Sequence, residues 1–204
     1  MHKILAFILS AILGVFTAPT YSQVIDRAQS SVVRITGDKD MMTLDGPQHG
    51  YYVCTGEVIA LNRVLTAAHC VGDRMLADGH DAKVLKADET TDLAVLEVAT
   101  KKPTLTMRDA PVERFETLSG IGYAWGLTRL SVLAERVFLT RVTPPDDNSP
   151  APKILVQPGF IGGMSGGPVV DTNGLMVGIV QETGDGIGLG VSVLQIRAFL
   201  ESVN

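Results

Sequence analysis

Short apolar runs separated by turn residues recur along most of the chain. In the first half they occupy residues 31–37, 51–60, 63–68, 81–87 and 92–98. In the second half they occupy residues 116–124, 135–142, 152–158, 167–171, 175–182 and 188–193. These runs are rich in Val, Ile, Leu and Thr, which favours β-strands. The segment Asp171-Thr172-Asn173-Gly174 separates two of them, and its Asn-Gly ending predicts a hairpin.

The last residues change period. Val193, Ile196, Phe199 and Val203 recur at helical spacing, and Ser192 with Gln195 is typical of a capping box. Residues 100–114 carry polar and proline punctuation and are interpreted as a connector, whereas the acidic, proline-rich residues 143–152 are interpreted as a surface loop. The pattern predicts an all-β protein of two six-stranded antiparallel β-barrels, residues 23–104 and 112–204, with a C-terminal α-helix.

The first residues have the layout of a secretory signal peptide. Lys3 precedes an apolar run from Ile4 to Phe16, and small and polar residues follow. This run is too short to cross a bilayer comfortably, so an uncleaved membrane anchor is the less favoured alternative. We expect residues 1–22 to be removed after Ser22 and the mature protein to be secreted or periplasmic, with no stable membrane insertion.

Charge and cysteine content narrow the partners. The formal net charge is −5, without a basic block, which argues against nucleic acid as a partner. Only Cys54 and Cys70 are present, and in an oxidising compartment such an isolated pair is expected to form a disulfide. No His or carboxylate pattern completes a metal site with this pair at the usual spacings, so no metal is expected there. The family resemblance described below implies no metal or organic cofactor either.

His69, in the stretch LTAAHC, is the candidate general base. A histidine acts on a hydroxyl nucleophile when a carboxylate fixes its tautomer and a serine lies within hydrogen-bond reach. Asp92, at the start of an apolar strand, is the favoured carboxylate, and Asp88 is the competing one. His49 and His80 lie in polar segments and are interpreted as surface residues.

Ser165, in the stretch GGMSGGP, is the candidate nucleophile. Its flanking glycines allow tight turns and let a substrate carbonyl approach the main chain. The N–H groups of Gly163 and Ser165 are therefore expected to converge as an oxyanion hole. The simpler alternative is a glycine-rich turn that carries a surface serine.

Three motifs in the order His, Asp, Ser (LTAAHC, DLAVL and GMSGGP) resemble the chymotrypsin-like serine proteases. Within that family the chain looks closest to the bacterial HtrA-like or trypsin-like peptidases, through the stretches GIGYAWGL and IGLGVSVLQIRAFL. The resemblance implies peptide-bond hydrolysis through an acyl-enzyme, with His69 as base, Asp92 as its orienting partner and Ser165 as nucleophile. It also implies that Cys54 and Cys70 form the disulfide behind the histidine.

The chain departs from the family at two places. Met164 stands where digestive relatives carry an aspartate that pairs with a new N-terminus, so activation by that route is not expected. The sequence stops at Asn204, so we expect no PDZ domain after the protease.

Substrate-binding residues follow from the same resemblance. Gly159 occupies the position that carries an acid in trypsin, which favours small or apolar residues at the cleavage site, in a pocket bounded partly by Phe160 and Ile161. The edge that pairs with an extended peptide or protein substrate aligns with Gln181, Glu182 and Thr183. The acidic side chain of Glu182 leaves open a preference for a basic residue at the cleavage site.

Two other functions are compatible with the same residues. A non-catalytic binding protein on a protease scaffold is one, because Met164 leaves open whether the oxyanion loop is ordered. An esterase with the same triad is the other, although nothing resembles the strand–elbow–helix context of α/β hydrolases. The sequence does not specify the oligomeric state.

Overall fold

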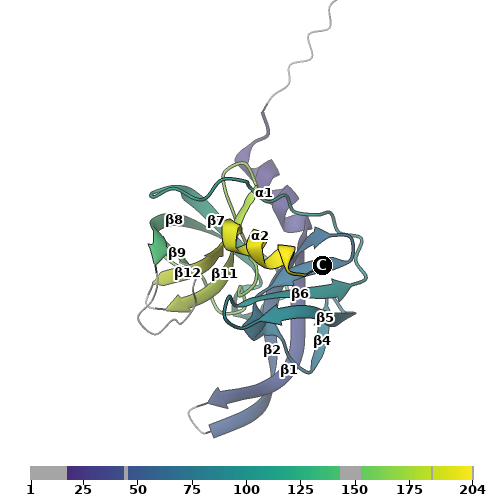
Figure 1. The fold of residues 1–204 in the computed structure, drawn as a ribbon. Helices are drawn as coiled ribbons and strands as arrows, with labels where there is room; N and C mark the ends of the chain where they lie inside the picture. Colours follow the sequence, from purple (N-terminus) through teal and green to yellow (C-terminus); the bar gives the residue numbers. More distant parts are fainter. Residues whose placement is uncertain (1–17, 44–45, 143–152, 185, 204) are drawn as a thin grey trace, which may run out of the picture.

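The computed structural model describes residues 18–43, 46–142, 153–184 and 186–203 of the chain. Two closed β-barrels, each of six antiparallel strands, lie next to each other (Figure 1), which confirms the predicted fold class. The first barrel contains β1 Val32–Thr43, β2 Gly46–Ala60, β3 Arg63–Thr66, β4 Arg74–Ala77, β5 His80–Asp88 and β6 Leu93–Val98. The second contains β7 Thr117–Gly122, β8 Ser131–Val142, β9 Lys153–Gln157, β10 Pro168–Val170, β11 Met176–Gly184 and β12 Ile187–Ser192.

The order of neighbouring strands is β1-β2-β3-β6-β5-β4 in the first barrel and β10-β11-β12-β9-β8-β7 in the second. The predicted hairpin joins β10 to β11, where the N–H of Gly174 donates to the carbonyl oxygen of Asp171 over 3.0 Å. Gly174 has a φ of +77°, which fits the glycine that such a turn favours. Residues 99–116, which contain the expected connector, pass from β6 to β7 with only a single isolated bridge, Met107 to Met176.

A short helix follows the last strand of the second barrel. The helix α2, Val193–Glu201, confirms the predicted C-terminal helix and buries Val193, Ile196 and Phe199. The Ser192 side chain accepts the Gln195 N–H over 3.4 Å, so the expected N-cap is present. The reciprocal half of the capping box is not, because the Gln195 side-chain amide has no partner among the described residues.

The structure contains two elements that the sequence pattern did not predict. The strand β4 lies between the expected strands 63–68 and 81–87, and the helix α1, Tyr21–Ser30, precedes the first barrel. The Thr20 side chain caps α1, so the expected cleavage after Ser22 falls within its first turn. Residues 1–17 of the expected leader and the expected surface loop 143–152 lie outside the described residues.

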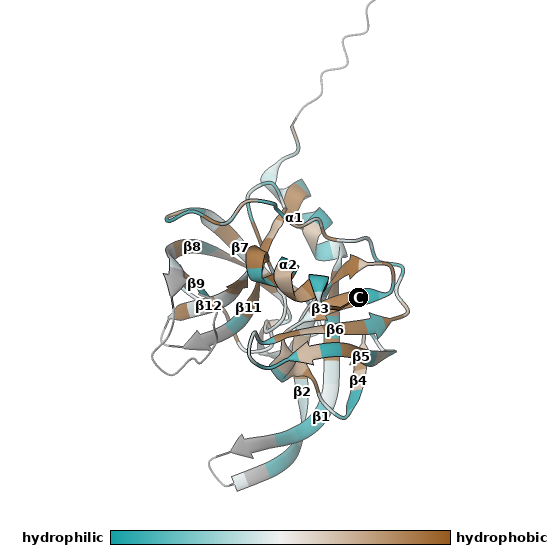
Figure 2. Ribbon diagram, viewed as in Figure 1, coloured by the Kyte–Doolittle hydropathy of each residue, from teal (hydrophilic) through white to brown (hydrophobic). Residues whose placement is uncertain are grey.

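Apolar side chains fill both barrels and the region between them. One cluster joins Ile35 and Leu65 of the first barrel to Ile121 and Ile179 of the second, so the barrels share an apolar interface. Figure 2 shows apolar residues concentrated in the barrels, whereas the coloured residues of the β1–β2 hairpin beyond the first barrel are mostly hydrophilic. None of the helices in the described part of the chain is long and apolar enough to cross a membrane.

Candidate active site

His69 lies on a short 3-10 helix, η1 Ala68–Cys70, that follows β3. Cys70 is joined to Cys54 of β2 by the expected disulfide, with a sequence separation of 16. Ala68 and Cys70 are buried, but the His69 side chain keeps 44% of its surface accessible. The backbone of the histidine is therefore anchored while an edge of its ring stays open.

Asp92 holds the histidine from β6. Its Oδ1 accepts the backbone N–H of His69 over 2.9 Å, and its carboxylate oxygens lie 2.9 and 3.0 Å from the ring Nδ1. A carboxylate can only accept here, so Nδ1 carries the proton and Nε2 is left as an acceptor. Asp92 has a φ of +55°, a conformation that aspartate tolerates better than most residues, immediately before Leu93 starts the strand.

Asp88, the competing carboxylate, forms hydrogen bonds within its own turn. It accepts hydrogen bonds from the backbone N–H groups of Thr90 and Thr91 at the turn before Asp92. Partial burial alone raises the pKa of Asp88, but the hydrogen bonds from the two threonines leave it lowered. The structure therefore brings Asp92, and not Asp88, to the histidine.

Ser165 lies beside the disulfide that anchors His69. Its carbonyl oxygen accepts the Thr55 N–H over 2.9 Å and lies 3.6 Å from the Cys70 sulfur. The next residue, Gly166, has a φ of +79°, and a Cβ there would lie 2.2 Å from the Thr66 hydroxyl. Only glycine allows this close approach, which places the serine segment against the end of β3.

Gly163 occupies a tight turn just before the serine. The Met164 N–H donates to the Ile161 carbonyl over 3.0 Å, and Gly163 has a φ of +92°, as expected at the third position of a type II turn. The Gly162 carbonyl accepts the Trp125 N–H over 2.7 Å, so the N–H on the other side of that trans peptide points away from Trp125.

Two backbone donors of this segment have no partner in the described part of the chain. Neither the Gly163 N–H nor the Ser165 N–H donates a hydrogen bond to any residue that the structure describes. A Cβ at Gly163 would lie 2.3 Å from the Tyr123 carbonyl oxygen, so the turn as built requires glycine. The geometry leaves both expected oxyanion donors available for a ligand.

Met164 is completely buried, with none of its surface accessible. It packs in the apolar cluster of the second barrel, and its carbonyl oxygen accepts the Gly167 N–H over 2.8 Å. The turn is thus held by an apolar side chain packed in the core. A buried aspartate at this position would need a positively charged partner, and Met164 does not.

Gly159 and Phe160 both make close contacts within the second barrel. The Gly159 N–H donates to Glu135 Oε2 over 2.9 Å, and a Cβ at Gly159 would lie 2.7 Å from the Ile187 backbone. Burial raises the pKa of Glu135, although the Gly159 hydrogen bond opposes the rise. Phe160 is 4% exposed and packs in the apolar cluster of the second barrel.

Gln181, Glu182 and Thr183 lie on β11. The pairing of β11 with β12 shifts between Val180 and Glu182, while β10 pairs with β11 only as far as Ile179. The end of β11 therefore has just one strand neighbour within the described part of the chain. The side chains of Glu182 and Thr183 lie outside what the structure describes.

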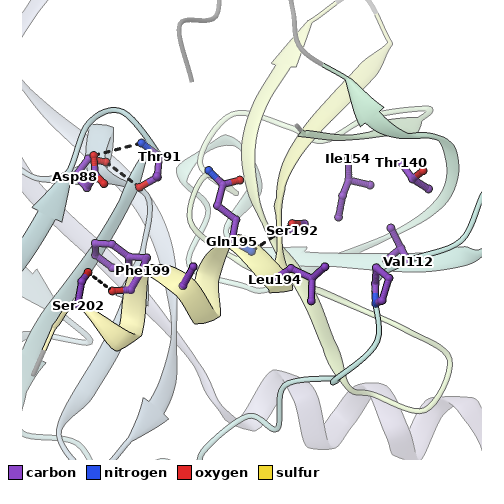
Figure 3. A pocket seen from close by; sticks show the side chains of 12 residues that line it. Asp88, Thr91, Val112, Thr140, Ile154, Ser192, Leu194, Gln195, Phe199 and Ser202 are labelled. Atoms are coloured by element: carbon purple, nitrogen blue, oxygen red, sulfur yellow. Dashed lines mark hydrogen bonds between the residues drawn. The ribbon is translucent and has the colours of Figure 1, made fainter. Parts of the chain in front are cut away.

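One cavity lies away from these residues. Its volume is about 620 Å³, and it is bounded by α2, the Asp88–Thr91 turn and Ile154 (Figure 3). None of His69, Asp92 and Ser165 lines it. Cys54, His69 and Cys70 are the one group of potential metal ligands close enough together in the described residues, but the disulfide occupies both sulfurs.

The comparison with protein families matches residues 54–179 to the trypsin-like peptidase domain, which is more than half of the chain. The chain belongs to the trypsin-like peptidase family. A comparison with curated protein sequences finds no match.

Solved structures agree with this family. The active form of the Rv3671c protease from M. tuberculosis is 24% identical, with a TM-score of 0.75 over 89% of this chain and 84% of that chain. Its inactive form is 25% identical, with a TM-score of 0.72 over 89% and 92% of the two chains. The HtrA-type protease AlgW with a decapeptide is 20% identical, with a TM-score of 0.78 over 91% and 67%.

Thr55 is a site residue that the sequence analysis missed. Its hydroxyl donates to the Gly163 carbonyl over 2.8 Å and accepts the Tyr123 N–H over 3.0 Å. These partners lie 108 and 68 residues away in the sequence. Its position directly after Cys54 was the only local signal of proximity to the peptidase site.

Proposed function

We propose that this trypsin-like peptidase is an exported serine endopeptidase that hydrolyses peptide bonds through a triad of Ser165, His69 and Asp92. The observation that carries the proposal is the His69–Asp92 pair, with Nδ1 held at 2.9 Å and Nε2 left as an acceptor. The expected leader and the Cys54–Cys70 disulfide support export.

The chemistry follows from these groups. His69 Nε2 takes the Ser165 hydroxyl proton as Oγ attacks the carbonyl carbon of the scissile peptide. The negative oxygen of the tetrahedral intermediate accepts hydrogen bonds from Gly163 and Ser165 N–H, the two donors that have no partner in the described structure. The imidazolium then gives its proton to the leaving amine, and water releases the acyl group by the same steps.

Substrate binding is assigned to the end of β11. Residues 181–183 lie where this strand lacks a β10 partner, so an extended peptide adds there as a further strand. Gly159 contributes its backbone to the pocket for the residue before the cleaved bond. Because no acidic side chain is present at Gly159, we propose small or apolar residues at that position.

The test is digestion of an unfolded protein, followed by mass spectrometry of the products. Wild type is expected to release internal peptides, S165A none, and the remote control S30A as many as wild type. Parallel rates on a matched amide and ester distinguish a peptidase from an esterase. Equal digestion by S165A and wild type would contradict the proposal.

A further inference from the structure

Lys39 connects the β1–β2 hairpin to the candidate catalytic histidine. The hairpin arm, residues 39–43 and 46–50, extends beyond the first barrel (Figure 1). At its base, Lys39 Nζ donates a hydrogen bond to the backbone carbonyl oxygen of His69. The two residues are 30 positions apart in the sequence, so this contact exists only in the folded barrel.

The lysine side chain is held by an aromatic ring. Its Nζ lies 4.9 Å from the centre of the Tyr52 ring, a distance that favours a cation–π interaction. Tyr52 is itself fixed, because a Cβ at Gly72 would lie 2.8 Å from its Cε1 and a Cβ at Gly37 would lie 2.6 Å from its hydroxyl. The ring is thus packed between two glycines and supports Lys39 from a defined position.

Asp38, the neighbour of Lys39 on β1, contacts the segment that follows His69. The Asp73 N–H donates to the Asp38 carbonyl oxygen over 2.9 Å, and the Asp38 carboxylate pairs with Arg74 over 3.0 Å. Burial lowers the pKa of Lys39, while the negative charge of Asp92 opposes this change. The charge of Asp92 thus favours the protonated form of Lys39, which is the form that donates to the His69 carbonyl.

These contacts hold both polar groups of the His69 backbone. Asp92 accepts the His69 N–H, and Lys39 donates to the His69 carbonyl. The 3-10 helix that carries the histidine is only three residues long and provides few hydrogen bonds of its own. Without the lysine, the imidazole loses one of the restraints that set its position.

We propose that Lys39 is a positioning residue that fixes His69 for catalysis by clamping its carbonyl group from the base of the hairpin arm. The inference rests on the proposed peptidase function and adds a residue to it. Lys39 acts through the histidine, so its loss is expected to lower kcat and to leave KM nearly unchanged. A small misplacement of a catalytic group lowers the rate by on the order of tenfold or more.

The experiment compares K39M, K39R and the exposed control K101M with wild type. K39M is expected to lose on the order of tenfold or more in kcat, with KM within about twofold. K39R keeps the charge, the donors and the stacking on Tyr52, and is expected to recover most of the loss. K101M should match wild type, and thermal unfolding verifies that each variant is folded.

A second readout does not depend on activity. The low-field proton NMR resonance of the His69 Nδ1–H reports its hydrogen bond to Asp92. We expect it to broaden or disappear in K39M and to remain in K39R and K101M. Failure of wild type to cleave peptides would count against the proposed function, while this resonance would still test the clamp.

The proposal is overturned if folded K39M keeps both the wild-type kcat and the His69 resonance. It is also overturned if kcat falls only in proportion to the fraction of unfolded protein, since that would make Lys39 an ordinary stabilising residue.

Discussion

Glu57 is a completely buried carboxyl group on β2. Its register partners are Val32 of β1 and Leu65 of β3, and neither of its oxygens has a hydrogen-bond partner in the described structure. Burial raises its pKa well above the ordinary value of 4.5. The folded protein therefore keeps this group protonated over a range of pH in which the unfolded chain has lost the proton.

This difference predicts a pH-dependent effect of E57Q. The folded state binds more protons than the unfolded state, so the contribution of Glu57 to stability is lost as pH rises from 4.5 through its folded-state pKa. The unfolding free energy of E57Q minus that of wild type should be larger at about pH 8 than at about pH 5, by about 1 kcal/mol or more. Urea unfolding at both pH values measures this gain, with the exposed E97Q as control; equal gains at both would contradict the prediction.

The three residues of the proposed triad could be predicted from the sequence because each stands in a recognisable local setting. His69 follows a strand beside a cysteine, Asp92 begins an apolar strand, and Ser165 is framed by glycines. Lys39 and Thr55 carry no such signal. Their contacts depend on how β1 and β2 lie against distant segments, which hydrophobic periodicity does not report.

Among the elements, η1 and its disulfide decide how firmly His69 is held. The helix is short and has no side-chain cap, and the Cys54–Cys70 bond ties its last residue to β2. A cross-link over a separation of 16 residues restricts the unfolded chain and stabilises the fold by about 3 kcal/mol in the chain-entropy model.

The double variant C54A/C70A tests this element. It is expected to lose about 3 kcal/mol of unfolding free energy, and its kcat should fall because η1 is less restrained. Urea unfolding without reductant gives the stability, and peptide turnover gives kcat. A variant as stable and as active as wild type would show that the disulfide does not support the site.

There are physical reasons why the sequence pattern did not predict β4 and α1. In β4, Arg74–Ala77, only Met75 and Ala77 are buried, and the strand is too short for its alternation to stand out from the polar residues around it. In α1, Val24, Ile25 and Ala28 form one buried face. That face spans barely more than one turn, and the helix begins inside the expected leader, so the sequence pattern does not separate the two.

On the scale of the whole molecule, the site depends on how the two barrels meet. Thr55 belongs to the first barrel, yet its hydroxyl bonds to Tyr123 and Gly163 of the second-barrel segment, and its N–H bonds to Ser165. One residue of the first barrel thus contacts both Gly163 and Ser165, whose N–H groups are the proposed oxyanion donors. Relative movement of the barrels is expected to change the turn.

T55V tests this link with little change in volume. It leaves the buried Tyr123 N–H and Gly163 carbonyl without their partner, at a cost of about 1–3 kcal/mol in stability. We expect kcat to fall on the order of tenfold, while T55S, which keeps the hydroxyl, stays close to wild type. Unfolding and turnover of both variants are measured together, and full activity of T55V would contradict the link.

The central claim is that Ser165 is a nucleophile activated by His69. The most direct measurement is mass spectrometry of the protein after reaction with a fluorophosphonate at neutral pH. Folded wild type should carry the label on Ser165, and labelling should be lost in S165A and H69A and on acidification, because a protonated imidazole does not accept the serine proton. A folded wild-type protein that stays unlabelled, or carries the label on another residue, would contradict the account.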